Sequence, residues 1–197
     1  MSEEELNKPT KYFIVIGLVV AVVVLFFLLR PSPVDNRNIV DYNYFKFEEI
    51  GGLWQTDIQL DGQLYEAAFR FNPTQVEDVY MTGNFSGFKQ KPIYLTFDPT
   101  SDSEQFKYLA LAASEMTLHI VRALNFTVEA ACTKNETDAC VGSPIVTCSD
   151  NASVIYLAPS APTQITLAGD CITLSGEGMD LLKSVDRLLF QWYKIMR

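Results

Sequence analysis

The N-terminal part of the chain contains one long uncharged run, the eighteen residues from Tyr12 to Leu29, in which Val, Leu, Ile and Phe predominate. As an α-helix rising about 1.5 Å per residue, such a run extends about 27 Å, close to the thickness of a bilayer's hydrocarbon core. Lys11 and Arg30 flank it. The run therefore predicts a transmembrane helix over residues 12–29, in contact with membrane lipid and preceded by a short tail over residues 1–11.

A cleaved signal peptide and a pilin-type stem are two other interpretations of this run. A signal peptide has a shorter apolar core followed by small residues at its cleavage site, whereas this run ends with the bulky residues Phe26 to Leu29. A pilin-type stem carries a Glu within its apolar stretch, and this stretch has none. We favour a permanent anchor. In this respect the first forty or so residues resemble single-pass surface proteins whose N-terminal helix is both signal and anchor.

The basic residues on the two sides of the run do not decide its orientation, because two lie on each side: Lys8 and Lys11, then Arg30 and Arg37. All the cysteines and all the glycosylation sequons follow the run, however. This placement predicts a cytoplasmic N-terminus and a glycosylated domain outside the plasma membrane. A further Asn-x-Thr triplet, at Asn72, is excluded by its proline. The four sequons begin at Asn84, Asn125, Asn135 and Asn151.

The cysteine pattern predicts disulfides rather than a metal or redox site. The spacing is C-x7-C-x7-C-x22-C, without the C-x-x-C pair of thioredoxin-like proteins or zinc ribbons. The sequence has a single histidine, His119, so we expect no metal site, and no motif predicts a cofactor. Two bridges can be connected in three ways. We favour Cys132–Cys140, closing one loop, and Cys148–Cys171, joining two strands.

The charge and the length limit the class of domain that follows the run. A formal net charge of −9 argues against nucleic acid as a partner. Residues 30–40 are polar and contain two prolines, which is typical of a stalk. The remaining residues, 41–197, have the length of one extracytoplasmic domain.

The first half of this domain has the alternation of strands. Apolar residues alternate over 53–60 and again over 63–71, with Asp61-Gly62 between them as the turn of a hairpin. A shorter strand is expected over Tyr42–Phe47. Further strands are expected over the ranges 92–97, 126–132, 153–157, 164–167 and 171–174, the last two forming a second hairpin.

Two helices are expected, and they complete the fold class. Ser101 and Glu104 have the spacing of a capping box, which predicts a helix from there to about Leu124. A second amphipathic helix should run from Met179 to Met196, with Lys183 and Arg187 on its exposed side. Together, the expected strands and helices predict an α+β (or α/β) fold: the transmembrane helix, then one two-layer domain with a mixed sheet and two helices.

Few residues have the pattern of a catalytic or binding site. On the first helix Glu115, His119 and Arg122 share a stripe, so His119 with Glu115 is a candidate acid–base pair, although an exposed row of ion pairs explains the stripe better. The Gly-rich segments 83–87 and 176–178 lack the spacing of a hydrolase elbow or a phosphate loop and are read as connections. Aromatic residues crowd the first strands as core or as a groove: Tyr42, Tyr44, Phe45, Phe47, Trp54, Tyr65 and Phe69.

The leading hypothesis from the sequence is a membrane-anchored, extracytoplasmic binding or assembly module, with a possible protein partner in the cell envelope and no detectable catalysis. The alternative is a membrane-tethered, hydrolase-like enzyme that uses His119 with a carboxylate such as Glu115. A subunit of a larger envelope complex is a third possibility.

Overall fold

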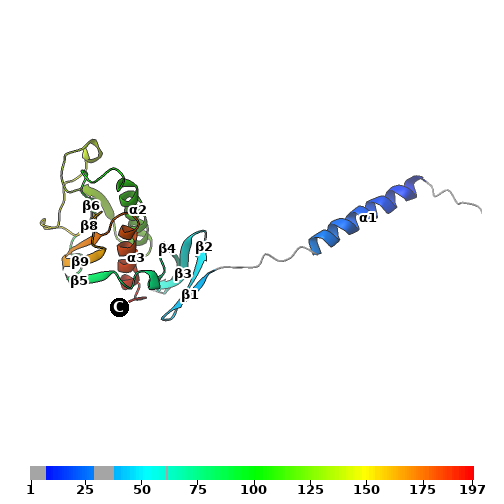
Figure 1. Ribbon diagram of the computed structural model, residues 1–197, viewed down its shortest axis with the longest axis horizontal. Helices are drawn as coiled ribbons and strands as arrows, with labels where there is room; N and C mark the ends of the chain where they lie inside the picture. The colour runs from blue at the N-terminus through cyan, green and yellow to red at the C-terminus, as the bar shows by residue number, and fades with distance from the viewer. Residues whose placement is uncertain (1–7, 29–37, 61) are drawn as a thin grey trace, which may run out of the picture. The chain divides into compact units, whose positions relative to one another are not determined.

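The computed structural model of the chain describes residues 8–28, 38–60 and 62–197 (Figure 1). The chain forms two compact units, Met1–Asn36 and Arg37–Arg197. Residues 1–7 of the predicted tail and 30–37 of the predicted stalk lie outside the described residues.

Helix α1 (Lys8–Leu28) contains all of the uncharged run except its last residue. Its apolar side chains are largely exposed: Phe13, Val15 and Leu18 are 75%, 59% and 63% exposed. Within the described part of the chain, no helix has both the length and the hydropathy needed to cross a membrane. The transmembrane helix over residues 12–29 therefore stays a prediction.

The second unit opens with a four-stranded antiparallel sheet of consecutive strands. The predicted hairpin is confirmed as the two longest of these strands, with Trp54 opposite Phe69 and Leu60 opposite Gln63. Side chains on one face of this sheet are buried, among them Phe47, Trp54 and Phe69. The strands are β1 (Ile39–Tyr42), β2 (Phe45–Ile50), β3 (Leu53–Leu60) and β4 (Gln63–Phe69).

The prediction of a single strand over Tyr42–Phe47 is wrong, because a turn divides that segment between β1 and β2. Asn43 in this turn has a φ of 52°, a conformation that Asn tolerates better than most residues. Its side-chain amide donates a hydrogen bond of 2.6 Å to the carbonyl of Ile195, near the C-terminus. The stalk prediction also reached too far, because β1 begins at Ile39.

The second sheet has six strands in the order β5-β9-β10-β8-β6-β7. All neighbouring pairs are parallel except β9 and β10, which form the predicted second hairpin. The predicted strand–helix–strand crossover is confirmed between β6 and β7. The strands are β5 (Tyr80–Phe85), β6 (Ile93–Phe97), β7 (Val128–Cys132), β8 (Val154–Ala158), β9 (Gln164–Gly169) and β10 (Cys171–Ser175).

The second unit has two helices, both with buried side chains on the faces that meet the sheets: α2 (Phe106–Arg122) and α3 (Asp180–Trp192). The predicted capping box does not form, since the hydroxyl of Ser101 donates to the carbonyl of Asp98 and α2 starts five residues later. Arg187 is buried rather than exposed, because its guanidinium donates to the side chain of Gln191 and to the carbonyl of Arg197.

The arrangement has three layers rather than the predicted two: the four-stranded sheet, the two helices and the six-stranded sheet (Figure 1). Phe190 of α3 lies 4.6 Å from Phe69 and 5.7 Å from Phe47, between ring centroids, so the small sheet packs on the helices. On their other side α3 contacts β9 and β10, and α2 contacts β7 and β8. The α+β class is confirmed, with two sheets in place of one, because alternation identifies strands but not the sheet that each strand joins.

Both disulfides have the favoured connectivity, Cys132–Cys140 and Cys148–Cys171. They attach the long segment 133–153 to the ends of β7 and β10. Val146 of this segment packs on the second face of the six-stranded sheet with Ala131 and Val154. The carbonyl of Val146 also accepts a hydrogen bond of 2.9 Å from the buried hydroxyl of Thr96. The segment therefore covers part of the sheet face that the helices leave open.

Candidate functional site

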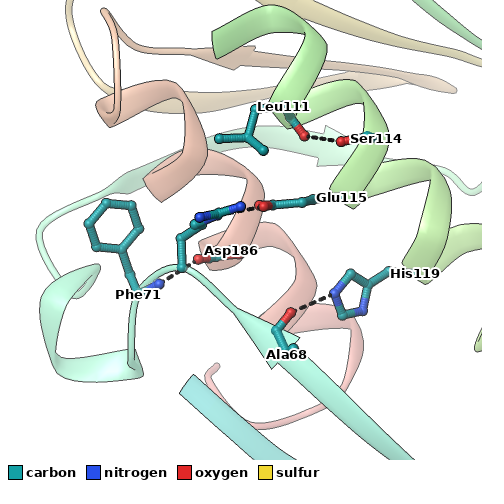
Figure 2. A network of polar contacts seen from close by, with 8 residues as sticks. Ala68, Phe71, Leu111, Ser114, Glu115, His119 and Asp186 are labelled. Carbon is teal, nitrogen blue, oxygen red and sulfur yellow. Dashed lines mark hydrogen bonds and ion pairs between the residues drawn. The ribbon is translucent and has the colours of Figure 1, made fainter. Parts of the chain in front are cut away.

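A cluster of polar side chains lies where the end of β4 meets α2 and α3 (Figure 2). The sequence places three titratable groups there, one or more on each helix: Glu115 and His119 on α2, and Asp186 on α3. The chain leaving β4 supplies Arg70 and the backbone of Phe71. These residues join the four-stranded sheet to the helical layer.

His119 is buried, with 7% of its surface exposed, and both ring nitrogens have partners. Its Nε2 lies 3.2 Å from the carbonyl of Ala68, so this nitrogen carries the proton and donates. Its Nδ1 then accepts from the hydroxyl of Tyr193, at 2.7 Å. The ring stacks on Phe69 with 5.1 Å between centroids. Burial lowers the pKa of His119 below its usual value, which favours this neutral tautomer.

Glu115 contacts Arg70 rather than His119. Its Oε1 lies 2.6 Å from Nε of Arg70, while its Oε2 is buried without a hydrogen-bond partner among the described residues. Burial raises the pKa of Glu115, and the arginine opposes this shift. The carboxylate of Glu115 is therefore held in an ion pair that joins Arg70, the residue after β4, to α2.

Asp186 is almost fully buried, and its Oδ2 accepts a hydrogen bond of 2.8 Å from the backbone N–H of Phe71. Burial raises the pKa of Asp186 well above its usual value, and the charge of nearby Glu115 raises it further. The hydrogen bond from Phe71 and the charge of Arg70 act in the opposite direction. Asp186 thus fixes the chain after β4 against the middle of α3.

The predicted acid–base pair is therefore not assembled as such. Glu115 is engaged by Arg70, and His119 by Tyr193 and Ala68, so neither side chain orients the other. Beside His119 there is a hollow of about 340 Å³, also lined by Glu66, Arg122 and Tyr193. The contacts of His119 favour a structural role, that of joining β4 to the residue after α3.

Sequence reasoning missed three members of this cluster: Arg70, Asp186 and Tyr193. Asp186 carried a signal in the sequence, because it directly follows the apolar stripe residue Val185. The burial of nearly all of Leu181–Phe190 became visible only in the structure. Arg70 and Tyr193 carried none, because only the packing of β4 on the helices brings them to Glu115 and His119.

The aromatic residues of the first strands are mostly core, which is the interpretation that the sequence favoured over a groove. Phe47, Trp54 and Phe69 are buried between the four-stranded sheet and the helices, whereas Tyr44, in the turn between β1 and β2, is fully exposed. The Gly-rich segment 176–178 connects β10 to α3, as expected. The segment 83–87, predicted as a loop, instead contributes its first three residues to β5.

Each sequon asparagine is exposed in the structure: Asn84 in β5, Asn125 and Asn135 on either side of β7, and Asn151 before β8. Within the sequon of Asn151, Ser153 is buried and its hydroxyl accepts a hydrogen bond from the backbone of Gln90. The asparagines are therefore accessible in the folded domain.

Across the described ranges, no group of three or more His, Cys, Asp or Glu side chains is arranged to hold a metal ion. Comparisons of the chain with protein-family models, with curated proteins and with solved structures found no match.

Proposed function

We propose that this chain is a single-pass, membrane-anchored binding or assembly module whose second unit, residues 37–197, lies outside the cell. The main observation in favour of a membrane anchor is the exposed apolar surface of α1. Side chains such as Phe13 and Leu18 expose most of their area, and exposed apolar surface of this extent is unfavourable in water. Lipid around residues 12–29 would cover that surface, and the uncharged run has the length that this requires.

The exterior location is supported by the two disulfides and by the exposed sequons. Disulfides persist in oxidising compartments and are rare in the cytosol, where thiols are kept reduced. Both bridges hold the segment 133–153 on the sheet, so they belong to the fold of the domain. Accessible asparagines are what glycan addition requires.

We propose that the outer face of the four-stranded sheet is the binding surface of this module. A hollow of about 670 Å³ lies over this face, whose side chains are mostly polar or acidic, with a few apolar ones and one lysine, Lys46. Asp57 and Glu66 lie directly opposite each other on β3 and β4. Like charges in this position cost stability, and a basic surface on a protein partner would relieve that cost.

The location can be tested on cells that express the full chain. External protease should degrade residues 37–197 in sealed, right-side-out cells, and a glycosidase should lower the apparent mass of the protein. Each of four single variants, in which one sequon asparagine is replaced by Gln, should lose one step of that mass shift. The positions are Asn84, Asn125, Asn135 and Asn151. Asn38→Gln is the matched control, because Asn38 is exposed and does not begin a sequon.

The opposite result would reverse the topology. If residues 37–197 resisted external protease and were cut only after lysis, with four free thiols and no glycans, the domain would face the cytoplasm. If carbonate at high pH released the chain from membranes, α1 would not be a membrane anchor.

A further inference from the structure

The second unit has an aromatic hollow that is separate from the polar cluster and from the outer face of the small sheet. It has a volume of about 420 Å³, within the range of small-molecule sites, and its walls are apolar. Phe85 and the nearby Phe88 come from β5 and the loop after it, Phe126 from the residues before β7, and Trp192 from the end of α3. These four side chains are half-buried, so the hollow is open to solvent at one side.

The ring geometry leaves aromatic faces and edges along the wall. Phe88 meets the rings of Phe85, Phe126 and Trp192 edge-to-face, with centroids 4.9, 6.4 and 6.1 Å away. Edge-to-face contact is a favoured arrangement of aromatic rings, and here it joins the four side chains into one wall. Of the remaining lining residues, Leu124 adds aliphatic surface, Ile93 and Ile120 are fully buried beneath the wall, and Gly87 contributes backbone alone.

Among the described residues, one cation lies against this wall. The ammonium of Lys91 is 5.2 Å from the ring centroid of Phe126. Lys91 is exposed, and among the residues that the structure describes no carboxylate lies within ion-pair distance of it. In a chain of formal charge −9, an apolar hollow beside an unpaired ammonium is complementary to an apolar molecule that carries one negative charge.

We propose that this hollow binds the chain of a fatty acid, with its carboxylate beside the ammonium of Lys91. The apolar walls take the hydrocarbon, whose transfer from water supplies most of the affinity. The lysine adds a modest amount, because an exposed ion pair contributes little, and it sets the preference for an acid over a neutral or cationic chain.

The proposal can be tested by photolabelling the full chain in lipid nanodiscs with a medium-chain fatty acid that carries a diazirine. Mass spectrometry should locate label on peptides that contain Phe85 and Phe88 or Trp192, apart from any label on α1. Unlabelled fatty acid should compete for these positions. A fatty alcohol and an alkyltrimethylammonium of equal length should compete at least about threefold more weakly, the size expected of an exposed charge pair.

Lys91→Gln should lower labelling of the hollow about threefold while labelling of α1 is unchanged. Lys89→Gln is the matched control, because it removes the same charge from an exposed residue of the same loop. Leu124→Trp, which adds volume at the wall, should abolish labelling there, with folding checked by circular dichroism. Label confined to α1, equal competition by the alcohol or the cation, or equal effects of the two lysine variants would each overturn the proposal.

Discussion

At the scale of single residues, the joint between the four-stranded sheet and the helices consists of polar groups with altered proton affinities. Burial lowers the pKa of His119 and favours its neutral form, and Asp186 is buried beside Glu115 and Arg70. Satisfied polar groups in such a position specify how two layers meet, because any other packing would leave them without partners. The contacts of this cluster therefore explain how the layers pack more directly than they explain any reaction.

Asp186 gives this joint a dependence on pH. Its pKa is higher in the folded than in the unfolded protein, so its contribution to stability is fully present below its unfolded pKa and is lost as pH rises through its folded pKa. Asp186→Asn keeps an oxygen that accepts from Phe71 but cannot ionise. The variant should match the parent near pH 4 and become relatively more stable as pH rises, by about 1.4 kcal/mol for each unit of pKa shift.

Urea unfolding at a series of pH values measures this difference. Asp180→Asn is the control, because Asp180 is on the same helix but its side chain is 48% exposed and pairs with Lys183. His119, whose pKa is lowered, acts in the opposite direction: its contribution is present above its unfolded pKa and is lost as pH falls through its folded pKa, in parent and variant alike. A constant difference between Asp186→Asn and the parent at every pH would contradict the assignment.

At the scale of elements, β5 depends on close contact with β9. Gly83 pairs with Leu167 across these parallel strands and has a φ of 90°. A Cβ at this position would collide with the backbone carbonyl of Leu167, which cannot rotate away as a side chain could. Only glycine therefore allows β5 to join the sheet at this register.

Two alanine variants separate the collision from the backbone conformation. Gly87 has nearly the same φ, 89°, but open space around its would-be Cβ. Gly87→Ala should cost only the strain of a positive φ, about 1–3 kcal/mol. Gly83→Ala should cost about 1–3 kcal/mol more than that, since backbone must move. Denaturant unfolding of both variants checks this, and equal losses would show that β5 is not held closely to β9.

At the scale of the whole molecule, the three layers separate the sequons from the proposed binding face. Asn84, Asn125, Asn135 and Asn151 all lie in or next to the six-stranded sheet, whereas none lies in β1–β4. Glycans would thus cover the surface around one sheet and leave the outer face of the other accessible. This separation is a property of the tertiary structure, because it depends on which strands form which sheet.

A new glycan on the open face tests its role. Asp57→Asn with Gln59→Thr creates a sequon on the exposed side of β3, and we expect it to abolish crosslinking to a partner in intact membranes. The control is Asp102→Asn with Glu104→Thr, which places a sequon on the exposed residues before α2. If the control abolished crosslinking as well, or if the β3 glycan left it intact, the four-stranded sheet would not be the interface.

Much of the local structure followed from the sequence because it depends on neighbours along the chain. Asp61-Gly62 between two alternating segments predicted the β3–β4 hairpin, and the strand–helix–strand spacing predicted the β6–β7 crossover. The favoured disulfide pairing was also correct. The predicted boundaries of strands and helices were wrong where a different local conformation formed. Asn43 forms a turn within the strand expected over 42–47, and the hydroxyl of Ser101 contacts Asp98 instead of capping α2.

The candidate site was predicted less well, because a helical stripe gives the neighbours of a residue on its own helix and nothing about the layer packed on it. Glu115 and His119 share a stripe, yet each takes its partner from another element, Arg70 and Tyr193. What the sequence determined by itself was the apolar run, most of the strands and both helices of the second unit, and the number of cysteines and sequons. The tertiary structure alone decided the division into two sheets and the partners of the polar groups, because those contacts join residues far apart in the chain.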